Sequence, residues 1–232
     1  MPSDQVTNRD ESTLATRSEV DAFLTDLKKR SGPSTRGRLI FALDATASRE
    51  ATWHTACKLQ AEMFLAAATV GSLDLQLVYY RGLGECRASR WISDCAQLAM
   101  IMSQIMCRAG ETQIEKILNH ASKETRLLKV SALVFIGDAM EESPDTVLST
   151  ANTLGQLSVP VFMFQEGRDP LVEKTFQDIA RLTHGAYCRF DPGAARQLAE
   201  LLKAVAVFAT GGLTALANQH NASAVKLLRQ LR

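Results

Sequence analysis

Short apolar runs alternate with longer amphipathic segments along most of this chain, and this alternation predicts an α/β protein. The run "VSALVFIGD" is apolar almost throughout, which is typical of a strand buried on both faces of a parallel sheet. Strands are predicted at 39–43, 73–80, 85–91, 130–138, 159–164 and 186–190. Helices are predicted at about 49–70, 94–107, 112–127, 141–156, 171–183 and 193–208.

The connections between these segments predict how the strands pair. A Gly-rich turn follows the second strand, so the second and third strands form a hairpin, whereas helices join the others. We therefore expect a Rossmann-like, doubly wound, three-layer sandwich with a mostly parallel sheet and flanking N- and C-terminal helices. Three regions are predicted: a polar tail with a short amphipathic helix (18–30) at 1–36, the sheet domain at 37–210, and a C-terminal helix (about 213–231) at 211–232.

Composition narrows the function classes. The chain has 26 basic and 25 acidic residues, so its net charge of +1 gives no field that would attract nucleic acid or an anionic membrane. The N-terminus is polar, and no apolar run reaches the roughly 18 residues that a membrane span needs. We expect a cytoplasmic protein that binds no nucleic acid and has no membrane span.

Polar residues gather where two of the predicted strands end. Asp44, Thr46 and Ser48 follow the first strand, Asp138 ends the fourth, and Thr112 follows a glycine at a helix start. Binding sites of doubly wound sheets form at the carboxyl ends of strands, so these side chains converge if the two strands are neighbours. Two carboxylates and three hydroxyls suit Mg²⁺ and not zinc. A ligand position left vacant could accept a carboxylate from a partner.

Each of these residues also has a structural interpretation. Ser48 could cap a helix, and Thr112 with Glu115 and Asp138 with Glu141 match capping boxes. Capping does not explain a carboxylate at a strand end followed by two hydroxyls at alternate positions. The combination across three loops therefore favours a metal site.

Other polar residues are weaker candidates. His54 and Cys57 could share one helix face, but no second pair accompanies them for zinc. Arg49 and Arg108 could flank the proposed site and meet a partner carboxylate. Glu141 and Glu142 are interpreted as acidic residues of a first helical turn, with a rim around the metal as the alternative.

The motif "DATAS" at 44–48, together with Thr112 and Asp138, resembles the von Willebrand factor type A (vWA) domain and its metal-ion-dependent adhesion site. Thr46 stands where the family motif has a serine, which keeps the hydroxyl. The resemblance covers roughly residues 37–208. It implies the strand order 3-2-1-4-5-6 with strand 3 antiparallel, and Mg²⁺ or Mn²⁺ held by the three hydroxyls, with both aspartates often acting through water.

The resemblance implies a non-catalytic module that binds another protein, with an Asp or Glu of the partner completing the metal shell, in some cases within a larger intracellular assembly. One alternative is a vWA-like scaffold that binds no metal. Another is a Mg²⁺-dependent phosphoryl-transfer or hydrolytic enzyme. The sequence has no P-loop and no GxSxG motif, and Thr46 occupies the place of the second aspartate that an aspartyl-phosphate hydrolase needs.

Overall fold

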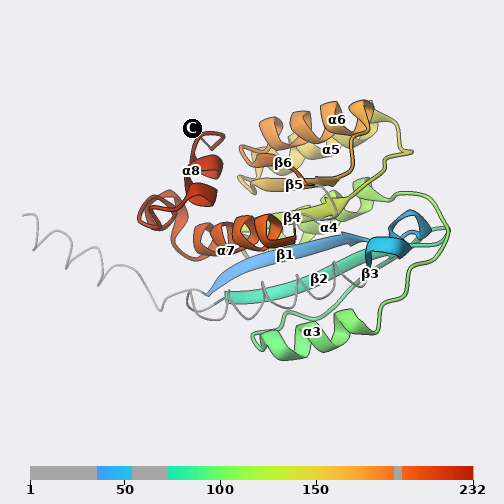
Figure 1. The fold of residues 1–232 in the computed structure, drawn as a ribbon, viewed down its shortest axis with the longest axis horizontal. Helices are drawn as coiled ribbons and strands as arrows, with labels where there is room; N and C mark the ends of the chain where they lie inside the picture. The colour runs from blue at the N-terminus through green and yellow to red at the C-terminus, as the bar shows by residue number, and fades with distance from the viewer. Residues whose placement is uncertain (1–35, 54–72, 191–194, 232) are drawn as a thin grey trace, which may run out of the picture. The chain divides into compact units, whose positions relative to one another are not determined.

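The sheet of this protein has six strands in the order β3-β2-β1-β4-β5-β6 (Figure 1). The computed structural model describes residues 36–53, 73–190 and 195–231. All neighbouring strands are parallel except β3, which pairs with β2 in antiparallel fashion. The strands are β1 (Gly37–Asp44), β2 (Leu73–Arg81), β3 (Glu85–Ala88), β4 (Ala132–Gly137), β5 (Val161–Glu166) and β6 (Ala186–Phe190). The predicted fold class and strand order are confirmed.

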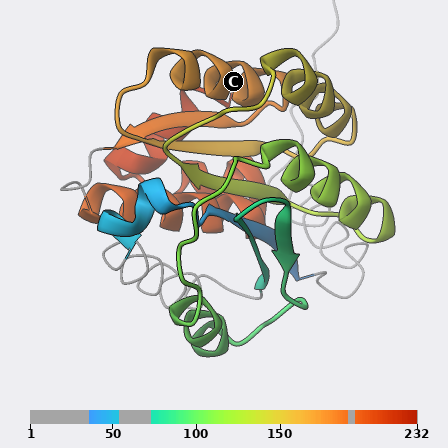
Figure 2. The ribbon, with the colours of Figure 1, turned by 90° about the vertical axis from the view of Figure 1, so that its right-hand side faces the viewer.

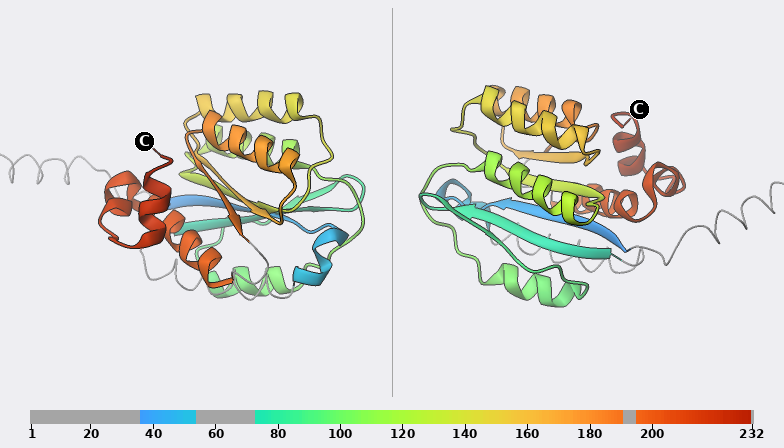
Figure 3. Two further views of the ribbon diagram at one scale, coloured as in Figure 1. Left: turned by 45° about the horizontal axis from the view of Figure 1, so that its top comes forward. Right: turned by 180° about the vertical axis from the view of Figure 1, so that it is seen from behind.

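Helices cover both faces of the sheet, which gives three layers (Figures 1 and 3). Helices α4, α5 and α6 pack beside one another on one face, whereas α3 and α7 contact β2 and β1 on the other. The helices are the 3₁₀ turn η1 (Ala47–Arg49), α3 (Cys95–Ser103), α4 (Ile114–Leu127), α5 (Pro144–Gln156), α6 (Pro170–Leu182), α7 (Ala195–Ala217) and α8 (Ala222–Leu228).

Strand β1 is central and holds both layers of the core. Its side chains alternate between the faces: Ile40 and Ala42 join the core under α4, α5 and α6, and Leu39, Phe41 and Leu43 join the opposite core. Every residue of β1 is buried. The strand therefore fixes the position of the polar loop that begins at its last residue, Asp44.

The C-terminal region differs from the single helix predicted over 213–231. Helix α7 continues to Ala217 through a kink at Gly212, whose φ of 65° favours glycine. The chain then turns before α8, and Asn221 caps that helix by accepting a hydrogen bond from the N–H of Ala224. The prediction of one helix is wrong because a local cap restarts the helix at 222. The break at the glycine pair is confirmed.

Helix α7 contains a long apolar stretch. Within the described residues, only Ala199–Ala217 is apolar and long enough to cross a membrane by composition alone. Half of this stretch is buried within the protein, and Leu202 and Val205 belong to the core beside the sheet. The apolar character of this stretch therefore has an explanation in the packing of α7 on β1.

Some predicted features lie outside the described residues. These are the helix at 18–30, the His54–Cys57 pair and most of the helix at 49–70. Strand β3 ends at Ala88, three residues before the predicted end at 91, and an isolated bridge between Leu75 and Ile92 continues the contact with β2.

Candidate functional site

The carboxyl ends of β1, β2 and β4 meet at one edge of the sheet, together with η1 and the segment that leads to α4 (Figure 2). Asp44 is fully buried there. Its Oδ1 accepts a hydrogen bond from the N–H of Thr46 at 2.8 Å, and its Oδ2 accepts one from the hydroxyl of Tyr80 at 2.9 Å. Both carboxylate oxygens are thus held in place by the protein.

Three further oxygens continue from this loop toward β4. Thr46 Oγ1 lies 3.0 Å from Ser48 Oγ, and Ser48 Oγ donates to Asp138 Oδ1 at 3.2 Å. Two adjacent ligands at about 2.1 Å from an octahedral ion lie about 3.0 Å apart. The spacing of these oxygens therefore fits a small divalent cation. Thr46 is buried, Asp138 is half-buried and Ser48 is exposed, so the group opens to solvent on the Ser48 side.

Thr112 makes different contacts from the other four predicted site residues. Its N–H donates to Glu141 Oε2 at 2.7 Å, and its Oγ1 accepts from the N–H of Glu141 at 2.9 Å. This reciprocal pair joins the segment before α4 to the loop after β4. The structure thus brings Asp44, Thr46, Ser48 and Asp138 into one hydrogen-bonded group and places Thr112 in a separate pair.

The capping predictions for Ser48, Thr112 and Asp138 are wrong, because other residues occupy the N-cap positions. The N-cap residues are Thr46 for η1, Gln113 for α4 and Ser143 for α5, and none of them makes a side-chain capping bond. Glu142 caps α4 instead: it accepts from the N–H groups of Ile114 at 2.7 Å and Glu115 at 2.9 Å. A residue distant in sequence therefore accepts hydrogen bonds from the N–H groups at the start of α4. The sequence pattern had predicted that residues at the start of the same helix would do so.

Arg49 does not flank the site as an available cation. It is 1% exposed, and its Nη2 lies 3.0 Å from Glu166 Oε2, at the end of β5. Its Nη1 donates to the carbonyl of Ile136 at 3.2 Å. Arg49 Nη2 is close to Glu166 Oε2 but is not aligned for a hydrogen bond. Arg49 Nε has no hydrogen-bond acceptor among the described residues. Arg49 ties the loop after β1 to the ends of β4 and β5.

The electrostatics of the oxygen group favour a cation. Burial raises the pKa of the Asp44 carboxyl above its ordinary value, hydrogen bonds from Thr46 oppose this, and the charge of Asp138 raises it further. Within the described residues, no basic side chain forms an ion pair with Asp44 or Asp138. In the same part of the chain, no three His, Cys, Asp or Glu residues cluster as a metal centre, so hydroxyls would have to supply the remaining ligands.

Tyr80 is a site residue that the sequence does not single out. It pairs with Asp44 in the β1–β2 register, and burial together with the charge of Asp44 raises the pKa of its hydroxyl well above the ordinary value. Only the pairing of the two strands brings these residues together. An aromatic residue ending an apolar strand otherwise predicts a core position.

Tyr80→Phe is expected to destabilise the protein by about 1–2 kcal/mol because Asp44 Oδ2 loses its donor in a buried setting. Chemical denaturation of the variant and the wild type measures this. Tyr79→Phe on the same strand is the matched control, since Tyr79 is only half-buried, and should change stability by less. Equal stability of Tyr80→Phe and wild type would contradict this role.

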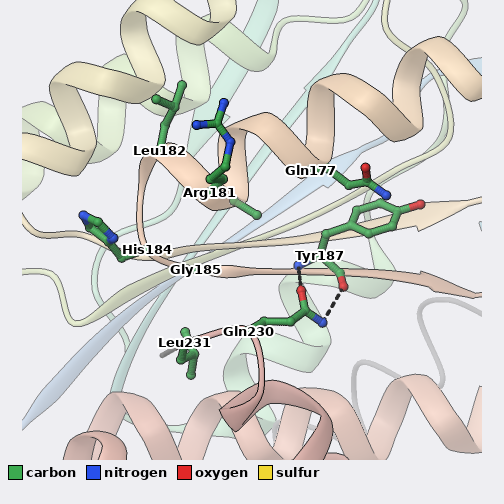
Figure 4. Close-up of a pocket in the computed structure, with 9 residues that line it drawn as sticks. Gln177, Arg181, Leu182, His184, Gly185, Tyr187, Gln230 and Leu231 are labelled. Atoms are coloured by element: carbon green, nitrogen blue, oxygen red, sulfur yellow. Dashed lines mark hydrogen bonds between the residues drawn. The ribbon is translucent and has the colours of Figure 1, made fainter.

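A cavity of about 810 Å³ lies beside β6, the edge strand of the sheet (Figure 4). It is lined by residues of α6, β6 and the C-terminal segment. The carboxamide of Gln230 accepts from the N–H of Tyr187 at 2.8 Å and donates to its carbonyl at 3.0 Å. The backbone of the edge strand is thereby paired at this residue. The strand-end group is the better candidate for a binding site because its two carboxylates form no ion pair with a basic side chain among the described residues.

Comparisons with known proteins agree with the geometry at the level of the fold. No family model and no curated protein matches the sequence. Among solved structures, a von Willebrand factor type A protein from Catenulispora acidiphila has a TM-score of 0.63 at 15% identity, over 76% of this chain and 43% of that one. This chain therefore spans less than half of that protein.

Two isolated domains are also similar. The SpRpn10 VWA domain has a TM-score of 0.59 at 11% identity, over 74% of this chain and 95% of that one. The vWF domain of the type V pili tip protein Mfa5 from Porphyromonas gingivalis has a TM-score of 0.60 at 8% identity, over 75% and 94%. The fold is therefore a doubly wound α/β sandwich. Within that class, this chain has the fold of vWA domains.

Proposed function

We propose that this protein is a non-catalytic interaction module that binds Mg²⁺ or Mn²⁺ at the strand-end site and uses the ion to bind a carboxylate of a partner protein. Asp44, Thr46, Ser48 and Asp138 would hold the ion, and Thr112 would join them from the segment before α4. The ion would supply a positive charge at an edge that is otherwise acidic. We further propose that the protein works in the cytoplasm, as part of a larger assembly.

The observation that carries this proposal is the run of three oxygens from Thr46 through Ser48 to Asp138. Their separations of 3.0 and 3.2 Å match adjacent octahedral positions, and the middle oxygen belongs to the solvent-exposed Ser48. Thr46 keeps its hydroxyl directed at Ser48, so the extra methyl group does not remove an oxygen from the set. The vWA fold adds support because one similar structure is a pilus adhesin, SpaC from Lactobacillus rhamnosus GG, and another is the human COPII-coat protein Sec24c.

Calorimetric titration with MgCl₂ and MnCl₂ tests the metal site. We expect the wild type to bind either ion, and Ser48→Ala to bind at least about tenfold more weakly, a loss of about 1.4 kcal/mol. Asp44→Ala should show no binding, because the buried negative charge and the order that its hydrogen bond gives to the loop are both lost. Ser103→Ala is the matched control, since its exposed hydroxyl bonds only a backbone carbonyl of its own helix.

The alternatives give different results in the same titration. A wild type that binds neither ion at millimolar concentration would leave a metal-free scaffold. Turnover of a phosphoryl substrate that is lost in Asp44→Asn would favour the enzyme. We favour the interaction module over the enzyme because the buried Arg49 is held by Glu166 and so is not free to bind a phosphoryl group.

A further inference from the structure

The β2–β3 hairpin and the segment before α4 form one continuous rim beside the metal site. The N–H of Gly82 donates to the carbonyl of Arg108 at 3.4 Å, and a Cβ at Gly110 would lie 2.1 Å from the carbonyl oxygen of Gly82. The N–H of Arg108 donates to the carbonyl of Ala45 at 3.0 Å. This rim is therefore attached by a hydrogen bond to the loop that carries Thr46 and Ser48.

Positive charge is in excess on this rim. Glu85 is the shared partner of three arginines: Arg81 at 3.1 Å, Arg87 at 2.8 Å and Arg108 at 3.8 Å. One carboxylate cannot neutralise three guanidinium groups. The side chains of Arg87 and Arg108 remain 68% and 70% exposed, so they can reach a second acidic group outside the protein.

The remaining charges on the rim leave this excess in place. Lys116 of α4 donates to the carbonyl of Gly84 and to Gln113, and so adds a fourth cation beside the hairpin. Glu111 is exposed in the neighbouring segment and offsets one of them. The tip of the hairpin, the segment before α4 and Lys116 therefore carry four basic side chains and two acidic ones.

Apolar side chains lie among these charges. Leu83, at the tip of the hairpin, is 87% exposed, and Met106, whose carbonyl accepts from Arg81, is 73% exposed. A hollow of about 350 Å³ lies between the hairpin and Arg108, with Leu83 and Glu85 in its wall. Large exposed apolar residues beside arginines are the composition of a protein-binding surface.

We propose that this rim, defined by Arg81, Leu83, Arg87, Met106 and Arg108, is a docking surface for an acidic segment of a partner protein that carries apolar side chains between its carboxylates. Its arginines pair with the acidic groups, and Leu83 and Met106 cover the apolar ones. The inference rests on the proposed function in one respect: a carboxylate of the same segment would reach the metal, next to Ala45.

The charge pattern disfavours a nucleic acid in this place. Glu141 and Glu142 contact the end of the same segment and the start of α4, so an unbroken phosphate backbone that follows the rim would meet these two carboxylates. A protein segment can place its acids opposite the arginines alone. Its apolar side chains also match Leu83 and Met106, for which a phosphate backbone has no counterpart.

The experiment uses fluorescence anisotropy of a labelled peptide that alternates acidic pairs with single leucines, in the presence of MgCl₂. Arg87→Glu/Arg108→Glu is expected to weaken binding by about tenfold or more, because two attractions become repulsions. The matched control is Lys123→Glu/Arg126→Glu, which makes the same charge change on exposed residues near the other end of α4 and should bind as the wild type does. A peptide with serine in place of leucine should also bind more weakly.

Several outcomes separate this proposal from the metal site. Calorimetry should give the same Mg²⁺ affinity for Arg87→Glu/Arg108→Glu as for the wild type, because neither side chain belongs to the oxygen group. A wild type that binds Mg²⁺ but not the peptide would overturn the docking surface and leave the metal site standing. Equal loss in both double variants, or equally tight binding of a single-stranded oligonucleotide, would also overturn it. Peptide binding that survives chelation of the metal would support the surface and count against the carboxylate–metal contact.

Discussion

Arg49→Met is expected to lower the free energy of unfolding by about 3–5 kcal/mol, because it leaves the buried carboxylate of Glu166 without a counter-charge. Arg49 is 1% exposed and Glu166 6%, so water cannot replace the lost partner. Thr52 Oγ1, at 3.3 Å from Glu166 Oε2, would be the one remaining side-chain donor to that oxygen among the described residues. Urea denaturation of the variant and the wild type measures the loss.

The double variant Arg49→Met/Glu166→Leu separates the charge effect from a packing effect. Removing both charges should restore most of the stability, because apolar side chains of similar size can replace a buried ion pair at little cost. Arg181→Met is the matched control, since its pair with Asp178 is exposed and should contribute less than about 1 kcal/mol. A single variant within about 1 kcal/mol of the wild type would show that the pair does not hold the loop.

The same substitution should weaken the proposed metal site only by shifting the positions of its residues, because Arg49 is not among the oxygens proposed to hold the ion. Arg49 directly follows Ser48, and its guanidinium anchors the 3₁₀ turn η1 to the carbonyl of Ile136 on β4. Strand β4 also leads to Asp138. The buried arginine therefore sets the distance between the two halves of the oxygen group, which is the distance that an ion must match.

The fold could be predicted from the sequence because the signals that define it are local. Apolar runs such as 132–137 are buried on both faces, and each strand forms close to where its pattern predicts it. The strand order came from the resemblance carried by the 44–48 motif and its distant partners. The C-terminal helix was mispredicted because Asn221 caps a new helix inside an otherwise helical composition.

The site could be predicted only in part, since its contacts depend on which loops the sheet brings together. The 44–48 motif and Asp138 stand out at the ends of apolar strands. Tyr80 does not, because a tyrosine in a strand has an ordinary local role. Glu142 was assigned to the first turn of its own helix, whereas it precedes α5 and caps α4. The role of Arg49 also could not be predicted from its neighbours in sequence. An arginine next to a polar motif suggests an exposed cation, and only the tertiary structure places it against Glu166.

The two charged features at the strand ends complement each other. The oxygen group and the nearby Glu141 and Glu142 form an acidic edge, and the rim attached to it through Ala45 is basic. An acidic segment would be repelled by the first and attracted by the second. The divalent ion that we propose for the oxygen group would remove the repulsion, so binding of the ion and of the proposed partner should strengthen each other by the same factor.

Glu142→Ala is expected to destabilise the protein by about 2–3 kcal/mol, because two backbone N–H groups at the start of α4 lose a shared carboxylate acceptor. Ile114 is fully buried, so its N–H is poorly placed to bond water instead. Glu142→Gln keeps one acceptor without the charge and should lose less. Denaturation gives the free energies, and amide hydrogen exchange at Ile114 and Glu115 reports the cap itself.

Glu111→Ala is the control for Glu142→Ala, because Glu111 is exposed in the segment before the same helix and should leave both amides protected. Glu141→Ala separates the two loop contacts: it removes the acceptor of the Thr112 N–H while the bonds of Glu142 to α4 remain. If the amides of Ile114 and Glu115 keep their protection in Glu142→Ala, the helix is capped by another group. If they lose it, the loop after β4 fixes the start of α4 and, through that helix, the position of Thr112 relative to the proposed metal site.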